Sequence, residues 1–310
     1  MPGKKKIIWK KISPVRDFKR KAGSRAKSIS NGVKKNVLKI FGWEVFLFCF
    51  TFGLGLFAAV EIQRFLAEQE VVLPTISFGN FITYFLFATL IILLVVYLPK
   101  IKRIRGAIYK FFFLFAAIYG TLVILPLFVP DILALLIIGL LIYFWFKSPT
   151  VALHDLLMVL SMAGIGAMFG LSFEPRIVII VLIVLSVYDF IAVYKTKHMV
   201  RMAKSMIERG VIMGIIVAPK VSDFWQDTRK IKPGGRFMIL GGGDIVFPLI
   251  FSASLISQGI VSALIVALFG LLGLIVSFAF FILSKKREPI PALPPIALFA
   301  ILGYIITLLI

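Results

Sequence analysis

The sequence predicts an all-α polytopic membrane protein with about nine transmembrane helices, its amino terminus inside and its carboxyl terminus outside. The chain has 310 residues, is 60% hydrophobic and has a mean hydropathy of +1.03. Soluble domains are nearer half apolar, and here the apolar residues gather in blocks close to the ~20 residues that a helix needs to cross ~30 Å of hydrocarbon. The placement of the cations then sets the orientation.

Nine apolar stretches predict the membrane spans. They cover 43–66, 77–99, 107–129, 131–146, 151–172, 176–194, 237–257, 259–284 and 290–310. The boundary between the third and fourth spans depends on Pro126, Pro130 and Asp131. In the fifth span, Gly166 and Gly170 form a small-xxx-small pair, which predicts close helix packing.

The net charge of +21 is explained by cations on one side of the membrane rather than by binding to a polyanion such as nucleic acid. With the amino terminus inside, 33 of the 35 Lys and Arg residues fall in the inner segments, and only Arg64 and Arg176 lie outside. Such an excess of cations on one side is typical of cytoplasmic loops. We therefore expect a multi-pass protein of the cell membrane and no nucleic-acid partner.

Four segments follow from this topology. Residues 1–40 form a basic cytoplasmic tail with 14 Lys and Arg, 41–194 hold spans one to six, 195–236 form a cytoplasmic loop, and 237–310 hold spans seven to nine. The tail either contacts anionic lipid or stays solvated, and the loop is expected to cover or admit access to a site. The single cysteine, Cys49, excludes an intrachain disulfide.

Acidic residues inside the spans are candidates for function because an ionised carboxylate in hydrocarbon costs several kcal/mol. Glu44 and Glu61 lie near the ends of the first span, from which a side chain can reach water. Asp155, beside His154, lies about one turn into its span, so an interfacial cap or a hydrogen bond to a neighbour explains it. The five acids in the spans are Glu44, Glu61, Asp155, Asp189 and Asp244.

Asp189 and Asp244 differ because two antiparallel spans carry them to similar depth. Asp189 precedes Lys195 by six residues and Asp244 follows Arg236 by eight, which places them about 9 and 12 Å below the inner face if both segments are helical. Two close carboxyl groups cannot easily both ionise, so the pair would share one proton, as in aspartic proteases. The alternative is a proton-sharing pair that only holds two helices together.

Two irregular segments accompany the pair. Gly241-Gly242-Gly243 directly precedes Asp244 and loosens the helix, which would let another backbone approach closely. Pro291-Ala292-Leu293-Pro294-Pro295 opens the last span with three prolines, which remove helix donors. Irregular backbone at membrane depth is tolerated where it is buried in protein or lines a wet cavity.

Taken together, these motifs resemble those of presenilin-type intramembrane aspartyl proteases, especially the archaeal presenilin homologues. Tyr188-Asp189, Gly241-Gly242-Gly243-Asp244 and Pro291-Ala292-Leu293 match the YD, GxGD and PAL motifs in order and in span. The resemblance implies that Asp189 and Asp244 are catalytic. It also implies that Tyr188, the three glycines, Pro291, Ala292 and Leu293 shape the site or dock substrate. Signal peptide peptidases share the motifs with opposite topology, which the charge distribution disfavours.

The resulting prediction is an intramembrane endopeptidase that cuts transmembrane helices of single-span membrane proteins with an aspartate dyad and without a metal or organic cofactor. The alternative is a proton- or cation-coupled transporter or channel that uses the paired aspartates. Transporters of that kind often contain inverted halves with matching interrupted spans. No such halves are evident, and the Tyr-Asp and Pro-Ala-Leu elements have no role in transport. A membrane scaffold would leave both aspartates unexplained.

Overall fold

The computed structural model describes residues 14–71, 79–80, 82–84, 86–87, 90, 102–232, 237–283 and 290–309. Side chains are described from residue 37 onward within these ranges, except those of 102–105 and 198. The second predicted span, 77–99, therefore lies mostly outside the described residues.

The described chain is mostly helical, with two short strands. The long helices and strands are α1 (Pro14–Glu68), α3 (Lys102–Ile124), α4 (Asp131–Lys147), α5 (Val151–Ser172), α6 (Pro175–Phe190), α7 (His198–Glu208), β1 (Gly214–Val217), β2 (Met238–Gly241), α8 (Gly242–Ser254), α9 (Ile260–Leu283) and α10 (Leu293–Thr307). Single helical turns follow several of them, at Leu125–Leu127, Ile191–Lys195, Val221–Trp225, Thr228–Lys230 and Ile256–Gln258.

Five helical segments of the described chain are long and apolar enough to cross a membrane. They are Val37–Glu68, Gly106–Leu127, Val151–Ser172, Pro175–Lys195 and Ile260–Leu283. Two shorter apolar helices, Gly242–Gln258 and Leu293–Thr307, fall at the predicted seventh and ninth spans. A multi-pass helical membrane protein is thus confirmed.

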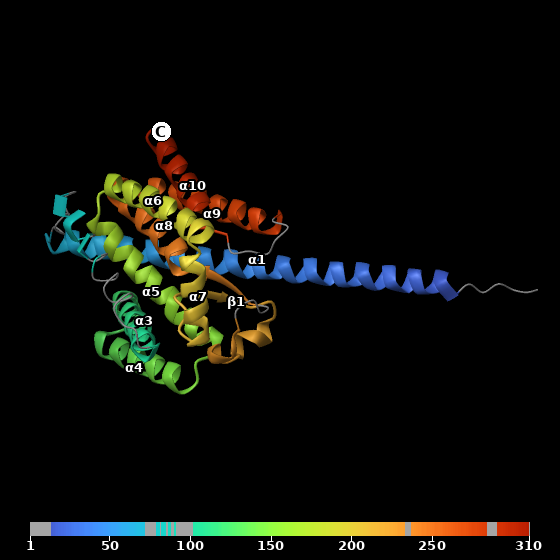
Figure 1. Cartoon of the computed structure of the whole chain (residues 1–310). Helices are drawn as coiled ribbons and strands as arrows, with labels where there is room; N and C mark the ends of the chain where they lie inside the picture. The colour runs from blue at the N-terminus through green and yellow to red at the C-terminus, as the bar shows by residue number, and fades with distance from the viewer. Residues whose placement is uncertain are drawn as a thin grey trace, which may run out of the picture.

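The first helix is longer than the sequence analysis predicted. The expected span began at residue 43, but α1 runs without interruption from Pro14 for 55 residues, and its amino-terminal half projects away from the other helices (Figure 1). Proline suits the first position of a helix, and α1 contains no other proline. The basic tail and the first span therefore share one helix from Pro14 onward.

The seventh span also differs, because its first residues are extended. Met238–Gly241 form β2, which pairs antiparallel with β1 in the register Gly214↔Gly241 and Val217↔Met238. A side chain at Gly214 would overlap the Leu240 carbonyl, so glycine permits the two strands to approach. Since α8 begins only at Gly242, Asp244 lies in its first turn. The helix-rise estimate of the depth of Asp244 therefore does not apply.

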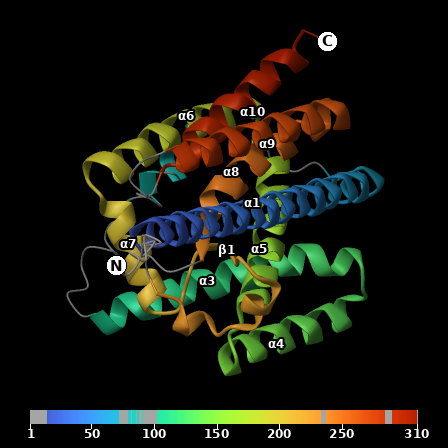
Figure 2. The ribbon, with the colours of Figure 1, turned by 90° about the vertical axis from the view of Figure 1, so that its right-hand side faces the viewer.

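Helix α5 is the centre of the bundle. It packs against α3, α8 and α1, while α9 and α10 pack together and α10 also contacts α6. In both views α3 and α4 lie at one end of the bundle and α9 and α10 at the other, with α1 between them (Figures 1 and 2). The core follows this arrangement, with Leu157, Leu249 and Phe251 almost fully buried between the central helices.

Glycines let α5 approach its neighbours closely. A Cβ atom at Gly164 would overlap the Gly120 backbone of α3, and one at Gly170 would overlap Ala253 of α8. A Cβ atom at Gly166 would lie 2.5 Å from Leu249, also on α8. The packing role predicted for Gly166 and Gly170 is confirmed. Bulk added at these contacts would push whole helices apart.

We predict that Gly164→Ala lowers the thermal stability of the detergent-solubilised protein, because overpacking of a tight core costs about 1–3 kcal/mol. The matched control is Gly139→Ala on α4, where an added Cβ atom has nothing within 4 Å. That control should be neutral or slightly stabilising, since alanine is the better helix former. Thermal unfolding of both variants measures the difference, and equal midpoints would contradict the close α3–α5 contact.

Candidate active site

The two predicted catalytic aspartates are both buried and interact with each other. Asp189 lies one residue before the end of α6 and is 5% exposed, and Asp244 lies in the first turn of α8 and is 9% exposed. The two carboxyl groups are within electrostatic range of each other. The fold therefore brings together two acids that are 55 positions apart in sequence.

Each aspartate lies where a regular helix begins or ends. Directly after Phe190, the chain turns from α6 into a π-helical turn over Ile191–Lys195, a distortion that is frequent at functional sites. Asp244 occupies the amino-terminal end of α8, where the helix dipole favours negative charge. At the end of α6 and at the start of α8, each carboxyl therefore lies next to backbone that is not in a regular α-helix.

Leu293 of the Pro-Ala-Leu segment joins the pair through its backbone. Its N–H group is directed at the carboxyls of both Asp189 and Asp244, although neither Asp189 oxygen has a partner at full hydrogen-bond distance among the described residues. The N–H groups of a first helical turn have no intrahelical acceptor. Pro294 and Pro295 have no N–H, so Leu293 provides the donor where α10 begins.

Gly241 makes the closest approach to Asp244. Its N–H is directed at the Asp244 carboxyl, and a Cβ atom on Gly241 would lie 2.9 Å from Asp244 Oδ2. Gly242 faces the opposite way, with its N–H donating to the Met213 carbonyl at 3.1 Å. A Cβ atom on Gly243 would only meet Phe247 of its own helix, at 3.4 Å. Of the three glycines, Gly241 has the strictest requirement for an absent side chain.

The remaining predicted site residues divide into two groups. Pro291 and Leu293 are buried and Ala292 is partly buried at the start of α10. Tyr188 precedes Asp189, but its side chain is 58% exposed and points away from the protein interior. The structure thus places the Pro-Ala-Leu segment at the aspartates and does not bring the Tyr188 ring to them.

Glu44 is a site neighbour that sequence reasoning did not identify. It was expected to reach water from the end of the first span, yet it is 2% exposed, and its Oε2 atom has no partner among the described residues. It also lies within electrostatic range of Asp244. Helical spacing places Glu44 on one face with Phe48 and Phe52, which are buried. In so apolar a span, that periodicity is too weak to distinguish a buried face.

Asp155 and His154 also differ from expectation, because neither lies at an exposed interface. They are 4% and 0% exposed, and both contact β1. Of the two roles predicted for Asp155, a hydrogen bond to a neighbour is confirmed and an interfacial cap is wrong. The neighbour is the backbone of a strand that is distant in sequence, so no local pattern indicated it.

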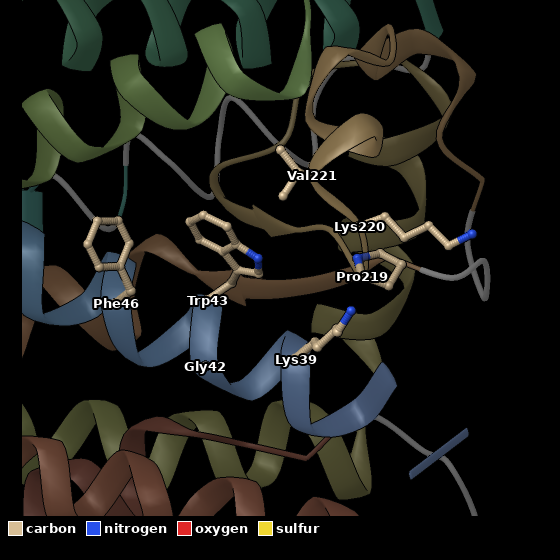
Figure 3. A pocket seen from close by; sticks show the side chains of 7 residues that line it. All are labelled: Lys39, Gly42, Trp43, Phe46, Pro219, Lys220 and Val221. Carbon is tan, nitrogen blue, oxygen red and sulfur yellow. The ribbon is translucent and has the colours of Figure 1, made fainter. Parts of the chain in front are cut away.

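An open pocket of about 510 Å³ lies apart from the aspartates, between α1 and the segment that follows β1 (Figure 3). Its lining combines aromatic and basic side chains and contains neither Asp189 nor Asp244. The residues are Lys39, Gly42, Trp43, Phe46, Pro219, Lys220 and Val221. Within the described residues, no group of three or more His, Cys, Asp or Glu side chains could hold a metal ion.

The chemistry that this arrangement can support is acid–base chemistry on one shared proton. Two carboxyls in electrostatic range and shielded from water favour a singly protonated pair. One member can then accept a proton from water while the other donates a proton to a carbonyl oxygen.

Comparison with known proteins identifies a family and a fold for this chain. The family described as signal-peptide peptidase, presenilin aspartyl protease matches residues 44–310. A solved presenilin family intramembrane aspartate protease in space group C222 is 23% identical, with a TM-score of 0.59 over 87% of this chain and 99% of that chain. One in space group P2 is 24% identical, with a TM-score of 0.49 over 86% and 96%. No curated protein sequence matches the chain.

The similar solved structure shows the same fold, and the family match extends from Glu44 to the end of the sequence. It includes both aspartates and all three motifs named above. The chain therefore belongs to the signal-peptide peptidase and presenilin aspartyl protease family, and it is an intramembrane aspartyl protease.

Proposed function

We propose that Asp189 and Asp244 are the catalytic dyad and that they cut the transmembrane helices of single-span membrane proteins. The observation that carries the proposal is the burial of two carboxyls, from α6 and α8, within electrostatic range of each other. In a membrane, such a pair is costly to keep, and the Leu293 N–H directed at both carboxyls is suited to holding them in place.

In the proposed reaction, the ionised member of the dyad takes a proton from a water molecule as its oxygen attacks the scissile carbonyl carbon. The protonated member gives its proton to the carbonyl oxygen, which forms a neutral tetrahedral intermediate. When the C–N bond breaks, the leaving nitrogen takes the proton of the protonated aspartate, and a hydroxyl group of the intermediate returns its proton to the ionised aspartate as the new carboxylic acid forms. One shared proton is thereby restored, and no metal or organic cofactor is needed.

The strand pair beside Asp244 supports a route for presenting the substrate. In an antiparallel pair, alternate residues bond to the partner and the residues between them face the other side. The Ile216 N–H faces α5, so Ile215 and Val217 face β2, and Ile239 directs its backbone away from β1. Gly241 lies on the same side of β2, with its N–H directed at Asp244. An extended peptide can add to such an edge. We propose that the substrate unwinds and pairs there, next to Asp244.

The proposal keeps the predicted topology of nine spans with the amino terminus inside, in the cell membrane. The five long apolar segments and the shorter α8 and α10 support it. Contact of the basic tail with anionic lipid also remains a proposal, since residues 1–13 lie outside the described residues. The pocket is lined by two exposed lysines, Lys39 on α1 and Lys220 after β1. We propose that they extend the contact of the basic tail with anionic lipid.

We predict that Asp189→Asn and Asp244→Asn each reduce cleavage by at least about 10²-fold, because an amide cannot exchange proton-transfer roles with a carboxylate. The double variant should be no worse than either single one, since the pair acts as a unit. The measurement uses purified protein in vesicles with a single-span substrate, followed by mass spectrometry of the fragments.

The control for the dyad is Asp131→Asn, which removes an exposed acid at the start of α4 and should leave cleavage unchanged. Substantial turnover by either dyad variant would refute the assignment. Ion flux through the same vesicles that persists in both variants would instead favour the transporter alternative.

A second prediction concerns the glycine beside the dyad. Gly241→Ala places a methyl group 2.9 Å from Asp244 Oδ2, so the carboxyl must shift, and misplacement on the order of 1 Å can cost about 10²-fold in rate. The rate constant kcat should fall while thermal stability stays close to that of Gly139→Ala. An active Gly241→Ala enzyme would show that this approach is not needed for catalysis.

A further inference from the structure

The outer edge of β1 is held by two adjacent side chains of α5. The Ile216 N–H donates to Asp155 Oδ1 at 2.8 Å, and His154 Nε2 lies 3.2 Å from the Gly214 carbonyl oxygen. A carbonyl oxygen only accepts, so His154 must carry its proton on Nε2. One side chain thus accepts from the strand and the other donates to it.

These two contacts occupy the side of β1 that faces away from β2. Gly214 and Ile216 are two positions apart, so their backbone groups point to the same side of the strand. With β2 on one side and α5 on the other, neither edge of β1 is free to receive another strand. Of the two strands, β2 alone keeps an outward backbone edge within the described residues.

The two side chains are themselves held rigidly. Asp155 and His154 are 4% and 0% exposed. The His154 ring stacks on Phe113 of α3, with ring centroids 5.1 Å apart and an interplanar angle of 8°. Phe113 in turn stacks on Trp145 of α4 at 4.6 Å. The contacts to β1 therefore originate from a helix that packs against α1, α3 and α8.

The position of β1 affects the position of Asp244, because the strands are paired and β2 is continuous with α8. Strand β1 pairs with β2, and β2 continues directly into α8, where Asp244 lies three residues after Gly241. A shift of β1 along α5 would move the outer edge of β2 relative to Asp189, which is carried by a different helix. The register of any strand paired with β2 would move with it.

We propose that Asp155 and His154 are positioning residues that fix the β1–β2 pair, direct the substrate to the β2 edge, and so determine which peptide bond reaches the aspartates. The role rests on the proposed function, in which the substrate pairs with that edge. Neither side chain touches the reacting atoms. They act through the strand, and the signature of their loss is a change in cleavage position.

The test compares three variants in the full-length protein. Asp155→Leu keeps the branched shape and removes the acceptor, whereas Asp155→Asn keeps an acceptor oxygen. Ser161→Ala removes another buried polar group of α5 and serves as the control. Hydrogen exchange of the peptide that contains Gly214–Val217 reports on the strand, and mass spectrometry of the fragments reports on the cleavage positions.

We expect Asp155→Leu to raise exchange at the Ile216 amide by about tenfold, the effect of losing one ordinary hydrogen bond. Its products should also spread over neighbouring peptide bonds. Asp155→Asn and Ser161→Ala should retain both the wild-type exchange and the wild-type cleavage positions. If Asp155→Leu does not fold, His154→Phe replaces it, because that variant keeps the stacking on Phe113 and removes the donor to Gly214.

The outcomes separate this inference from the proposed function. Unchanged hydrogen exchange in both Asp155→Leu and His154→Phe would show that the two side chains do not hold β1, whatever happens to cleavage. Raised exchange with unchanged cleavage positions would overturn the positioning role and leave the dyad intact. Failure of the dyad assignment would appear in a separate measurement, because Asp189→Asn would then retain cleavage.

Discussion

The backbone leading into Asp244 needs hydrogen-bond partners within the protein, and this constraint organises much of the structure around the site. An unsatisfied N–H or C=O group at membrane depth costs several kcal/mol. In β2, Met238 and Leu240 meet that requirement by pairing with β1, and in β1 Ile216 and Gly214 meet it on the far side through Asp155 and His154. Non-helical backbone is thereby kept beside the buried carboxyl of Asp244, where a regular helix would hide its peptide groups.

The close packing of α5 makes that local irregularity tolerable. Glycines at Gly120 and Gly164 bring α3 against α5, and Gly166 and Gly170 do the same for α8. Because small residues allow such approach between helices, α5 serves as a fixed support for both the strand pair and α8. The stack of His154, Phe113 and Trp145 extends the support to α3 and α4.

The electrostatic environment of the dyad contains more than two acids. Glu44 of α1 is buried within range of Asp244, so three carboxyls from three helices lie around one site. Like charges at short range disfavour simultaneous ionisation. The amino-terminal end of α8 and the Leu293 N–H act in the opposite sense, since each favours a negative charge on Asp244.

Much of this protein was predictable from its sequence, because the relevant signals are local. Apolar blocks identified the helices, and the fifth predicted span coincides with α5 at Val151–Ser172. The spacing of Gly166 and Gly170 identified a packing face. The YD, GxGD and PAL motifs indicated the family, which the family match confirms, and singled out two aspartates that the fold brings together. Each of these signals depends only on residue type and on the spacing along one segment.

Other features were decided only by the tertiary structure. The apolar run at 237–257 is compatible with a continuous helix, and it begins as a strand because Gly214–Val217, distant in sequence, supplies its partner. Asp155 and Glu44 were predicted to be interfacial because the sequence shows how far each residue lies from the end of its span. The sequence does not show which other segment of the protein covers a side chain. Burial and strand pairing are properties of contacts between segments, and no single segment contains the information that determines them.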